Sequence, residues 1–221
     1  MKEINLVIPM KVPSESKQRL KSALDQDERY QLAMALFEQT LSFFNQHFSQ
    51  LPMLVVTPSD LVAALARQYG AKVLMEEKSE GLNQALDKAT QWSLVNGFKR
   101  QLILPADIAN FKVSEIEHLL SCETGHQGVV IGVAKDKGTN ALLCTPPNAI
   151  AFQFGFESSK AHQIEALSRS LNCHLLHLPL LGQDVDIPTD LAYLKAPLHL
   201  LDKGASFLTK SRREQNVCFN G

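Results

Sequence analysis

The sequence has few cysteines, no excess of charge and no long hydrophobic run. Its four cysteines form neither a CxxC pair nor a dense disulfide framework, so we expect free thiols and a cytoplasmic location. The 22 basic and 23 acidic residues give a net charge of -1, which disfavours extended binding to nucleic acid or to an anionic membrane. No apolar stretch is long enough to span a bilayer, and residues 1–20 are too charged for a signal peptide.

Several catalytic signatures are also missing. The sequence contains no GxxxxGK[ST], GxGxxG, HExxH or GxSxG motif, and no repeat of fixed length. The sequence therefore does not support a P-loop enzyme, a dinucleotide-binding fold, a zincin, an α/β-hydrolase or a solenoid.

What remains is an ordinary globular composition of 221 residues, 45% of them apolar. This length suits one α/β domain, which we assign to residues 1–202. Residues 203–221 show little periodicity and are expected to be a solvated tail.

Short β-branched or leucine-rich runs alternate with segments of helical periodicity. The alternation predicts parallel strands joined by helical crossovers, with ligands bound beyond the carboxyl ends of the strands. We expect strands buried on both faces at residues 4–9, 51–57, 71–75, 101–104, 128–134, 141–144 and 174–178. An apolar stripe from Ala33 to Phe48, after a capping box at Asp25 and Glu28, predicts the clearest helix. Further helices are expected at residues 60–68, 82–95, 113–120, 159–171 and 189–194.

Three cations follow the first predicted strand. Lys11, Lys17 and Arg19 lie on a loop that leads into a helix start, where side-chain charge and backbone N–H groups can bind a polyphosphate. A solvated surface is the alternative interpretation.

Three carboxylates also stand where chemistry is expected. Asp107 lies just past the apolar strand that ends at Leu104, although it could instead cap the following turn. Asp184 and Asp186 are two apart in an extended segment, so their side chains point the same way and Val185 points oppositely. Two adjacent like charges favour a cation such as Mg2+, unless one aspartate turns outward or caps a helix opened by Thr189.

Two glycine-containing turns complete the candidates. Gly81 with Asn83, and Gly138 with Thr139 and Asn140, place a permissive backbone beside an amide or hydroxyl that can orient a ligand. Taken alone, both segments are ordinary turns.

In their order along the chain, these segments resemble the guanylyltransferase family of coenzyme F420 biosynthesis. The resemblance covers nearly the whole chain except the tail. It is carried by IPMK at 8–11, KQRL at 17–20, VVTPSD at 55–60, EGLNQAL at 80–86, LPADI at 104–108, GTNALL at 138–143, FGFESSKAH at 154–162 and DVDIPTDL at 184–191.

The resemblance implies a single-domain α/β nucleotidyltransferase, glycosyltransferase-A-like and Rossmann-like, with a mostly parallel mixed sheet flanked by helices. It implies roles for eleven residues: triphosphate binding by Lys11, Lys17 and Arg19, the guanine nucleoside near Gly81 and Asn83, Mg2+ at Asp107, Asp184 and Asp186, and the phospho-acid at Thr139, Gly155 and Ser158. The sequence departs from the family pattern at Ala109 and Asn110, and at Gln18 within KQRL, which bears on the choice of acid.

The implied reaction transfers GMP from GTP to 2-phospho-L-lactate, phosphoenolpyruvate or 3-phospho-D-glycerate, with release of pyrophosphate. The phosphate of the acid is itself the nucleophile, which agrees with the missing catalytic triads. A homodimer is possible. Two other hypotheses stay open: a cytidylyl- or uridylyltransferase acting on a sugar phosphate or pterin, and a catalytically silent nucleotide-binding module.

Overall fold

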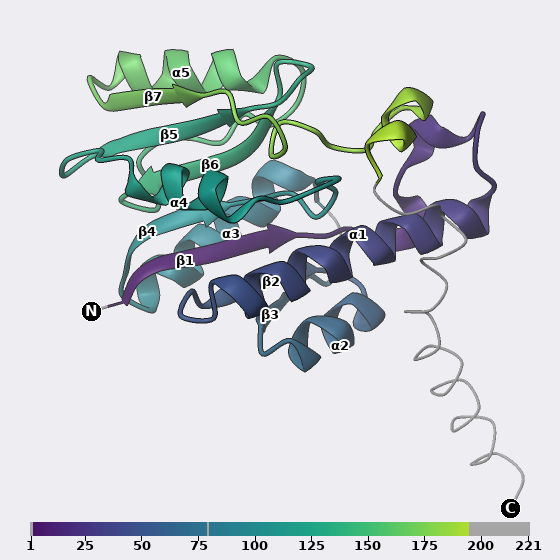
Figure 1. Ribbon diagram of the computed structural model, residues 1–221. Coiled ribbons are helices and arrows are strands. Elements are labelled where there is room, and N and C mark those ends of the chain that lie inside the picture. The colour runs from purple at the N-terminus through teal and green to yellow at the C-terminus, as the bar shows by residue number, and fades with distance from the viewer. Residues whose placement is uncertain (1, 79, 195–221) are drawn as a thin grey trace, which may run out of the picture.

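Seven strands form one sheet at the centre of the molecule (Figure 1). The computed structural model describes residues 2–78 and 80–194. The order of the strands across the sheet is β3-β2-β1-β4-β6-β5-β7. The strands are β1 (Lys2–Pro9), β2 (Met53–Thr57), β3 (Lys72–Met75), β4 (Phe98–Ile103), β5 (Gly128–Val133), β6 (Thr139–Thr145) and β7 (Asn172–Leu176).

The sheet is mixed, and most of its strand pairs are parallel. β1 pairs in parallel with β2 and β4, β2 with β3, and β5 with β7, whereas β6 runs antiparallel to both β4 and β5. All seven predicted strands are therefore confirmed. The expectation that each is buried on both faces is wrong for β3 and β7, which carry exposed residues because they are the two edges of the sheet.

The helices lie in two layers (Figure 1). α1 begins after Asp25, whose side chain and that of Glu28 form the expected reciprocal capping box, with both bonds at 2.8 Å. α2 and α3 cover the predicted ranges, and α4 and α5 differ from prediction at their ends. The bounds are α1 (Gln26–His47), α2 (Asp60–Gln68), α3 (Leu82–Val95), α4 (Val113–Ser121) and α5 (Ser158–Ser168).

Each face of the sheet has its own hydrophobic core. Because side chains alternate along a strand, Leu6 and Ile8 of β1 pack on one side and Val7 packs on the other. The first core is closed by α1, α2 and α4, with Phe37 and Phe44 among its fully buried side chains. The second is closed by α3 and α5. This three-layer arrangement leaves the carboxyl ends of the strands free to carry a site.

A smaller core caps that end of the sheet. Leu20 and Leu24, from the loop after β1, pack with Val185 and with Leu191 near the end of the described chain. Leu191 belongs to η3 (Pro188–Tyr193), a 3-10 helix where the sequence predicted a helix over 189–194. In Figure 1 the purple loop and the yellow-green η3 lie side by side. Two segments distant in sequence are thereby joined beside the carboxyl ends.

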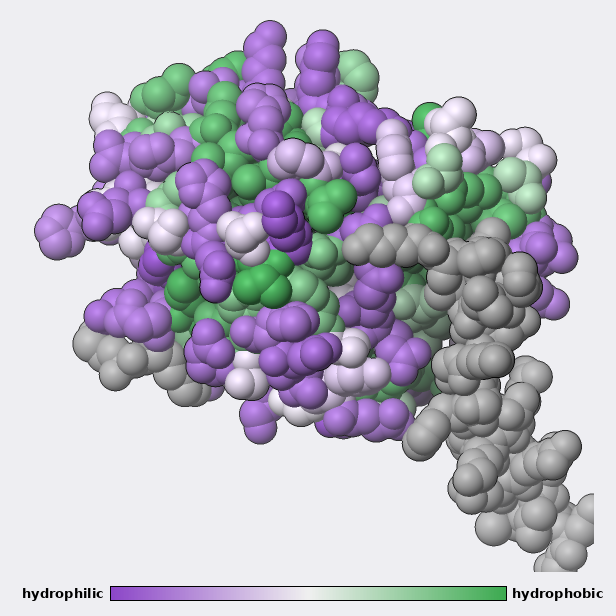
Figure 2. All heavy atoms as spheres, in the orientation of Figure 1, coloured by the Kyte–Doolittle hydropathy of each residue, from purple (hydrophilic) through white to green (hydrophobic). Residues whose placement is uncertain are grey.

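The surface shown in Figure 2 is mostly hydrophilic, with apolar residues in small groups. Across residues 2–78 and 80–194, no helix combines the length and the apolar character needed to cross a membrane. The predicted boundary at residue 202 and the tail 203–221 lie outside the described residues.

Candidate functional site

A cavity of about 410 Å³ opens at the carboxyl ends of the parallel strands, where the alternating pattern predicts ligands. Its volume falls in the ordinary range of small-molecule sites, about 300–1,000 Å³. Its walls come from the ends of β1 and β2, the segments after β3 and β4, both α1 and α3, and the segment before η3. They include Lys11, Ser16, Lys17, Val56, Glu76, Gly81, Leu82, Ala85, Asp107 and Asp186.

Two backbone segments are joined so that the predicted acids meet. The Ala109 N–H donates to Gln183 O at 2.8 Å, and the Val185 N–H donates to Asp107 O at 3.1 Å. Ile108 and Asp184 form an antiparallel bridge between these contacts. Val185 is fully buried in the small core, while its two aspartate neighbours remain partly exposed. The short pairing places Asp107 beside the segment 184–186.

Lys17 contacts two of these carboxylates. Its Nζ lies 2.6 Å from Asp107 Oδ2 and 3.2 Å from Asp186 Oδ1, and its side chain is only 5% exposed. Lys17 has a left-handed backbone, with φ of 54°, at the start of a short 3-10 helix. Burial alone would lower the pKa of Lys17, but the charges and hydrogen bonds of Asp107 and Asp186 outweigh burial and raise that pKa.

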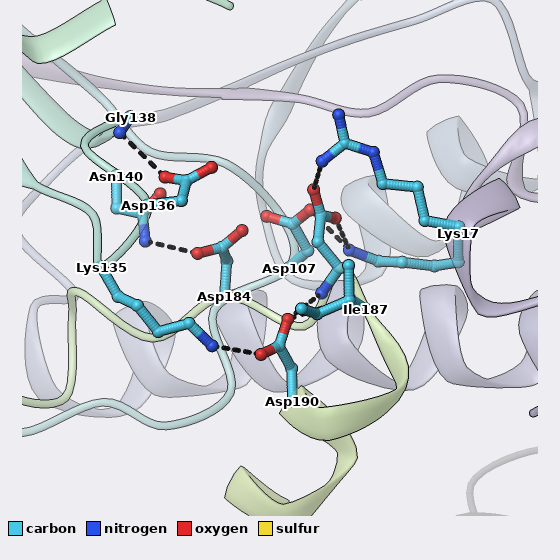
Figure 3. A network of polar contacts seen from close by, with 11 residues as sticks. Lys17, Asp107, Lys135, Asp136, Gly138, Asn140, Asp184, Ile187 and Asp190 are labelled. Atoms are coloured by element: carbon cyan, nitrogen blue, oxygen red, sulfur yellow. Dashed lines mark hydrogen bonds and ion pairs between the residues drawn. The ribbon is translucent and has the colours of Figure 1, made fainter. Parts of the chain in front are cut away.

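Asp184 lies on the other side of Asp107 from Lys17 (Figure 3). Its Oδ1 accepts a hydrogen bond from Asn140 Nδ2 at 3.2 Å, and the same amide group donates to Leu181 O. Burial, with the negative charge of Asp107 and then of Asp186, raises the pKa of Asp184 to about 6, against the opposing hydrogen bond from Asn140. The negative charge of this acidic group, which consists of Asp107, Asp184 and Asp186, is therefore only partly compensated.

Asp190 fixes the backbone beneath this acidic group. Its Oδ2 accepts hydrogen bonds from the Asp186 and Ile187 N–H groups, both at 2.9 Å, and its Oδ1 pairs with Lys135 Nζ. Lys135 also donates to the Tyr193 hydroxyl at 3.1 Å. Burial opposes ionisation of Asp190, but Lys135 and the two N–H groups together lower its pKa. Asp190 thus holds Asp186 in place through the main chain.

The two exposed cations stand nearer the solvent. Arg19 Nη1 lies 3.7 Å from Asp186 Oδ2, and its side chain is 71% exposed. Lys11 is exposed and lines the cavity. Lys17 and Arg19 thus form ion pairs with the acidic group, whereas Lys11 is placed only at the cavity. Lys17 contacts carboxylates where the sequence predicted a phosphate contact.

The predicted nucleoside residues lie at the start of α3. Gly81 lines the cavity and directly precedes α3. Its own φ is 105°, a conformation that favours glycine. Asn83 instead uses its Oδ1 to accept the Phe154 N–H at 3.0 Å. Asn83 therefore ties α3 to the loop before α5.

The predicted acid-binding residues form a chain of hydrogen bonds that leads to a buried histidine. Ser158 Oγ donates to Thr139 Oγ1 at 3.1 Å, and Thr139 Oγ1 lies 3.0 Å from His162 Nδ1. Gly155 accepts the Ser158 N–H through its carbonyl at 3.2 Å. Burial lowers the pKa of His162 to about 4, so the ring is neutral near pH 7. None of the three predicted residues lines the 410 Å³ cavity, and their binding role stays a prediction.

The side chains as they stand do not form a metal site. Within the described part of the chain, no three aspartate, glutamate, histidine or cysteine side chains converge to hold a metal ion. Lys17 lies between Asp107 and Asp186 instead. The donors nearby are carboxylate oxygens, which are the ligands that Mg2+ prefers.

The sequence alone missed Asp190 and Glu76. It named Asn140 only as an amide that could orient a ligand, whereas Asn140 orients Asp184. Asp190 lies within a quoted motif, yet nothing local indicated that it holds Asp186. Glu76 follows a predicted strand directly, as Asp107 nearly does, so the same criterion could have singled it out.

The fold and the acidic end of its sheet define an α/β protein of the nucleotidyltransferase-like class. Over 96% of this chain and 98% of the other, the fold resembles a Desulfovibrio desulfuricans protein assigned as a nucleotide-diphospho-sugar transferase, with a TM-score of 0.67 and 15% identity. The chain belongs to the family described as Guanylyl transferase CofC like, which matches residues 4–212.

Two relatives are similar over most of their length. A protein of Colwellia psychrerythraea named 3-phospho-D-glycerate guanylyltransferase is 48% identical over 190 residues, covering 86% of this chain and 90% of the relative. A protein of Roseiflexus named phosphoenolpyruvate guanylyltransferase is 32% identical over 192 residues, covering 86% and 84%. The family predicted from the sequence motifs is confirmed.

Proposed function

We propose that this protein transfers GMP from GTP to the phosphate of a small phosphorylated acid, with 3-phospho-D-glycerate the first candidate. The observation that carries the proposal is the meeting of Lys17 with carboxylates from two distant segments in one cavity. Family membership supports the guanylyl transfer. The relative with 48% identity supports the choice of acid.

In the proposed reaction a phosphate oxygen of the acid attacks the α-phosphorus of GTP. A new P–O bond forms, the bond between the α-phosphorus and its bridging oxygen breaks, and pyrophosphate leaves with the bonding pair. The attacking phosphate is already an anion at neutral pH, so no side chain has to remove a proton. The protein's task is to position two anions and to offset their charge.

The chain's cations suit that task. Lys17 is held in place by its two ion pairs, beside the cavity in which the phosphates are proposed to bind. Lys11 borders the same cavity and Arg19 stands at the edge of the acidic group. We assign triphosphate binding to these three side chains.

Mg2+ belongs to the same proposal. Asp107, Asp184 and Asp186 provide the oxygen donors that suit it, and Asn140 and Asp190 orient two of those carboxylates. When bound, the ion would withdraw charge from phosphate oxygens. The carboxylates then serve as ligands and take no part in proton transfer.

The proposal extends to the setting of the enzyme. We infer a role in coenzyme F420 biosynthesis, a cytoplasmic location and a homodimer. Light scattering of the purified chain tests the homodimer, because a mass near twice 24.5 kDa is expected and a mass near 24.5 kDa would contradict it.

The decisive assay offers GTP, Mg2+ and each of the three acids to the purified protein. Pyrophosphate release and a product heavier than the acid by one guanylyl group are expected with 3-phospho-D-glycerate. Replacing GTP by CTP or UTP should abolish both signals. Turnover with CTP or UTP would instead support a different nucleotidyltransferase, and GTP binding without any pyrophosphate release would support a silent binding module.

A further inference from the structure

Glu76 is a buried acid at the far end of the cavity. It follows β3 directly, its N–H donates to Thr57 O at 3.0 Å, and only 8% of the residue is exposed. Its side chain lines the cavity. Among the residues that the structure describes, Oε1 of Glu76 is buried and has no hydrogen-bond partner.

An unpaired buried carboxylate oxygen is costly, so its presence calls for a physical reason. The neighbouring cation does not supply one, because Lys88 Nζ is bound to Glu80 Oε2 at 2.6 Å. Burial, against the attraction of Lys88, raises the pKa of Glu76. The fold therefore gains nothing visible from this carboxylate, whereas a ligand with N–H donors would satisfy it.

The place of Glu76 relative to the acidic group suggests which part of a ligand it meets. Glu76 follows β3 and Asp107 follows β4, with β2 and β1 between them. Three strand spacings separate these ends by about 14 Å. This separation makes Glu76 a poor partner for a metal ion at Asp107, and places it where the end of a nucleotide opposite its phosphates would lie.

The wall beside Glu76 suits a planar base. Val56 of β2, with Leu82 and Ala85 of α3, gives the cavity an apolar lining near this acid. Gly81 borders the same cavity, and a Cβ added there would meet no atom within 4 Å, so its backbone is open on that side. An apolar slot ending in one hydrogen-bond acceptor is a common form of base-binding pocket.

We propose that Glu76 recognises guanine, accepting hydrogen bonds from the N1–H and the 2-amino group of the base. This inference rests on the proposed function and names the residue that selects its nucleotide. Guanine offers two adjacent donors on one edge, which matches the two oxygens of a carboxylate. Adenine and cytosine present a ring acceptor beside their amino group, and uracil flanks its single N–H with two carbonyls, so a carboxylate disfavours all three.

The test compares GTP with inosine triphosphate, whose base keeps the N1–H but lacks the 2-amino group. We expect the wild-type kcat/KM to be about 10- to 100-fold higher for GTP, since a hydrogen bond to a charged group is lost with the analogue. Glu76→Gln should lower the kcat/KM for GTP by a similar factor and bring the ratio of the two substrates near one. The exposed neighbour gives the control Glu77→Gln, which should keep the wild-type ratio.

Two further measurements separate the possible outcomes. Without nucleotide, the melting temperature of Glu76→Gln should equal or exceed that of the wild type, because the removed charge has no partner. A drop of several degrees would assign Glu76 a structural role and overturn the inference. Titration calorimetry with GDP and inosine diphosphate tests recognition without turnover. An unchanged preference for guanine in Glu76→Gln refutes the inference, even if the wild type is active. A wild-type protein that is inactive with every acid refutes the proposed function, even if it binds GDP more tightly than inosine diphosphate and Glu76→Gln removes that preference.

Discussion

Replacing Lys17 by methionine tests the electrostatics of the site most directly. The change keeps much of the side-chain volume but removes the ammonium that lies between Asp107 and Asp186. The two carboxylates then face each other, and the nearby Asp184, without that positive charge. We expect Lys17→Met to destabilise the protein in Mg2+-free buffer.

The size of the effect follows from burial. Removing one partner of a fully buried ion pair costs about 3–5 kcal/mol, whereas an exposed pair is worth about 0–1 kcal/mol. The Lys17 side chain is 5% exposed, but those of Asp107 and Asp186 are 31% and 41% exposed. An intermediate loss of about 2 kcal/mol is therefore expected, which lowers the melting temperature by about 4–8 °C for a chain of this size.

Urea unfolding with and without Mg2+ measures both parts of this prediction. Lys11→Met is the matched control, because Lys11 is an exposed lysine on the same loop, and it should change stability by less than about 0.5 kcal/mol. Added Mg2+ should stabilise Lys17→Met more than the wild type, since its acids remain and the competing ammonium is gone. Equal stability of Lys17→Met and Lys11→Met would refute the reasoning. So would an equal stabilisation of Lys17→Met and the wild type by Mg2+.

Three further predictions concern the scaffold. Asp190→Ala should lower the free energy of unfolding by about 3 kcal/mol in urea, because the N–H groups of Asp186 and Ile187 lose their acceptor, and should slow turnover at saturating substrate. The pKa of His162 is about 4 in the folded protein against 6.5 ordinarily, so the unfolded chain takes up the proton at a higher pH than the folded protein does. The free energy of unfolding should therefore fall by about 3 kcal/mol as the pH drops from 6.5 to 4. Unfolding curves of His162→Gln should lack that component. Phe37→Ala, which empties a fully buried site of the first core, should cost about 3–5 kcal/mol by the same measurement, and a loss under 1 kcal/mol would contradict the packing described.

Much of the architecture could be predicted because local patterns and tertiary packing agree. The stripe of α1 and its capping box are written within one segment, as are the bounds of α2 and α3. The exposure of β3 and β7 depends on strand order, which no single segment contains. The pattern of residues 189–194 could indicate a helix, but it could not distinguish the 3-10 geometry of η3 from an α-helix.

The site shows the same division. The strand end indicated Asp107, and alternation indicated that Asp184 and Asp186 share a face. Their meeting was implied only by the family resemblance, because it depends on a backbone pairing between segments distant in sequence. The contacts of Lys17 could not be predicted, because they depend on a left-handed bend and on a long flexible side chain that reaches Asp107. The roles of Asp190 and Glu76 depend on which neighbours satisfy a buried carboxylate, and only the folded chain decides that.

The central claim is that the acids beside Lys17 serve guanylyl transfer. Pyrophosphate release by Asp186→Ala, measured against the wild type at saturating GTP, Mg2+ and 3-phospho-D-glycerate, tests it most directly. The account predicts a rate lower by about two orders of magnitude or more, with the folded state retained in circular dichroism. Turnover equal to that of the wild type would contradict it.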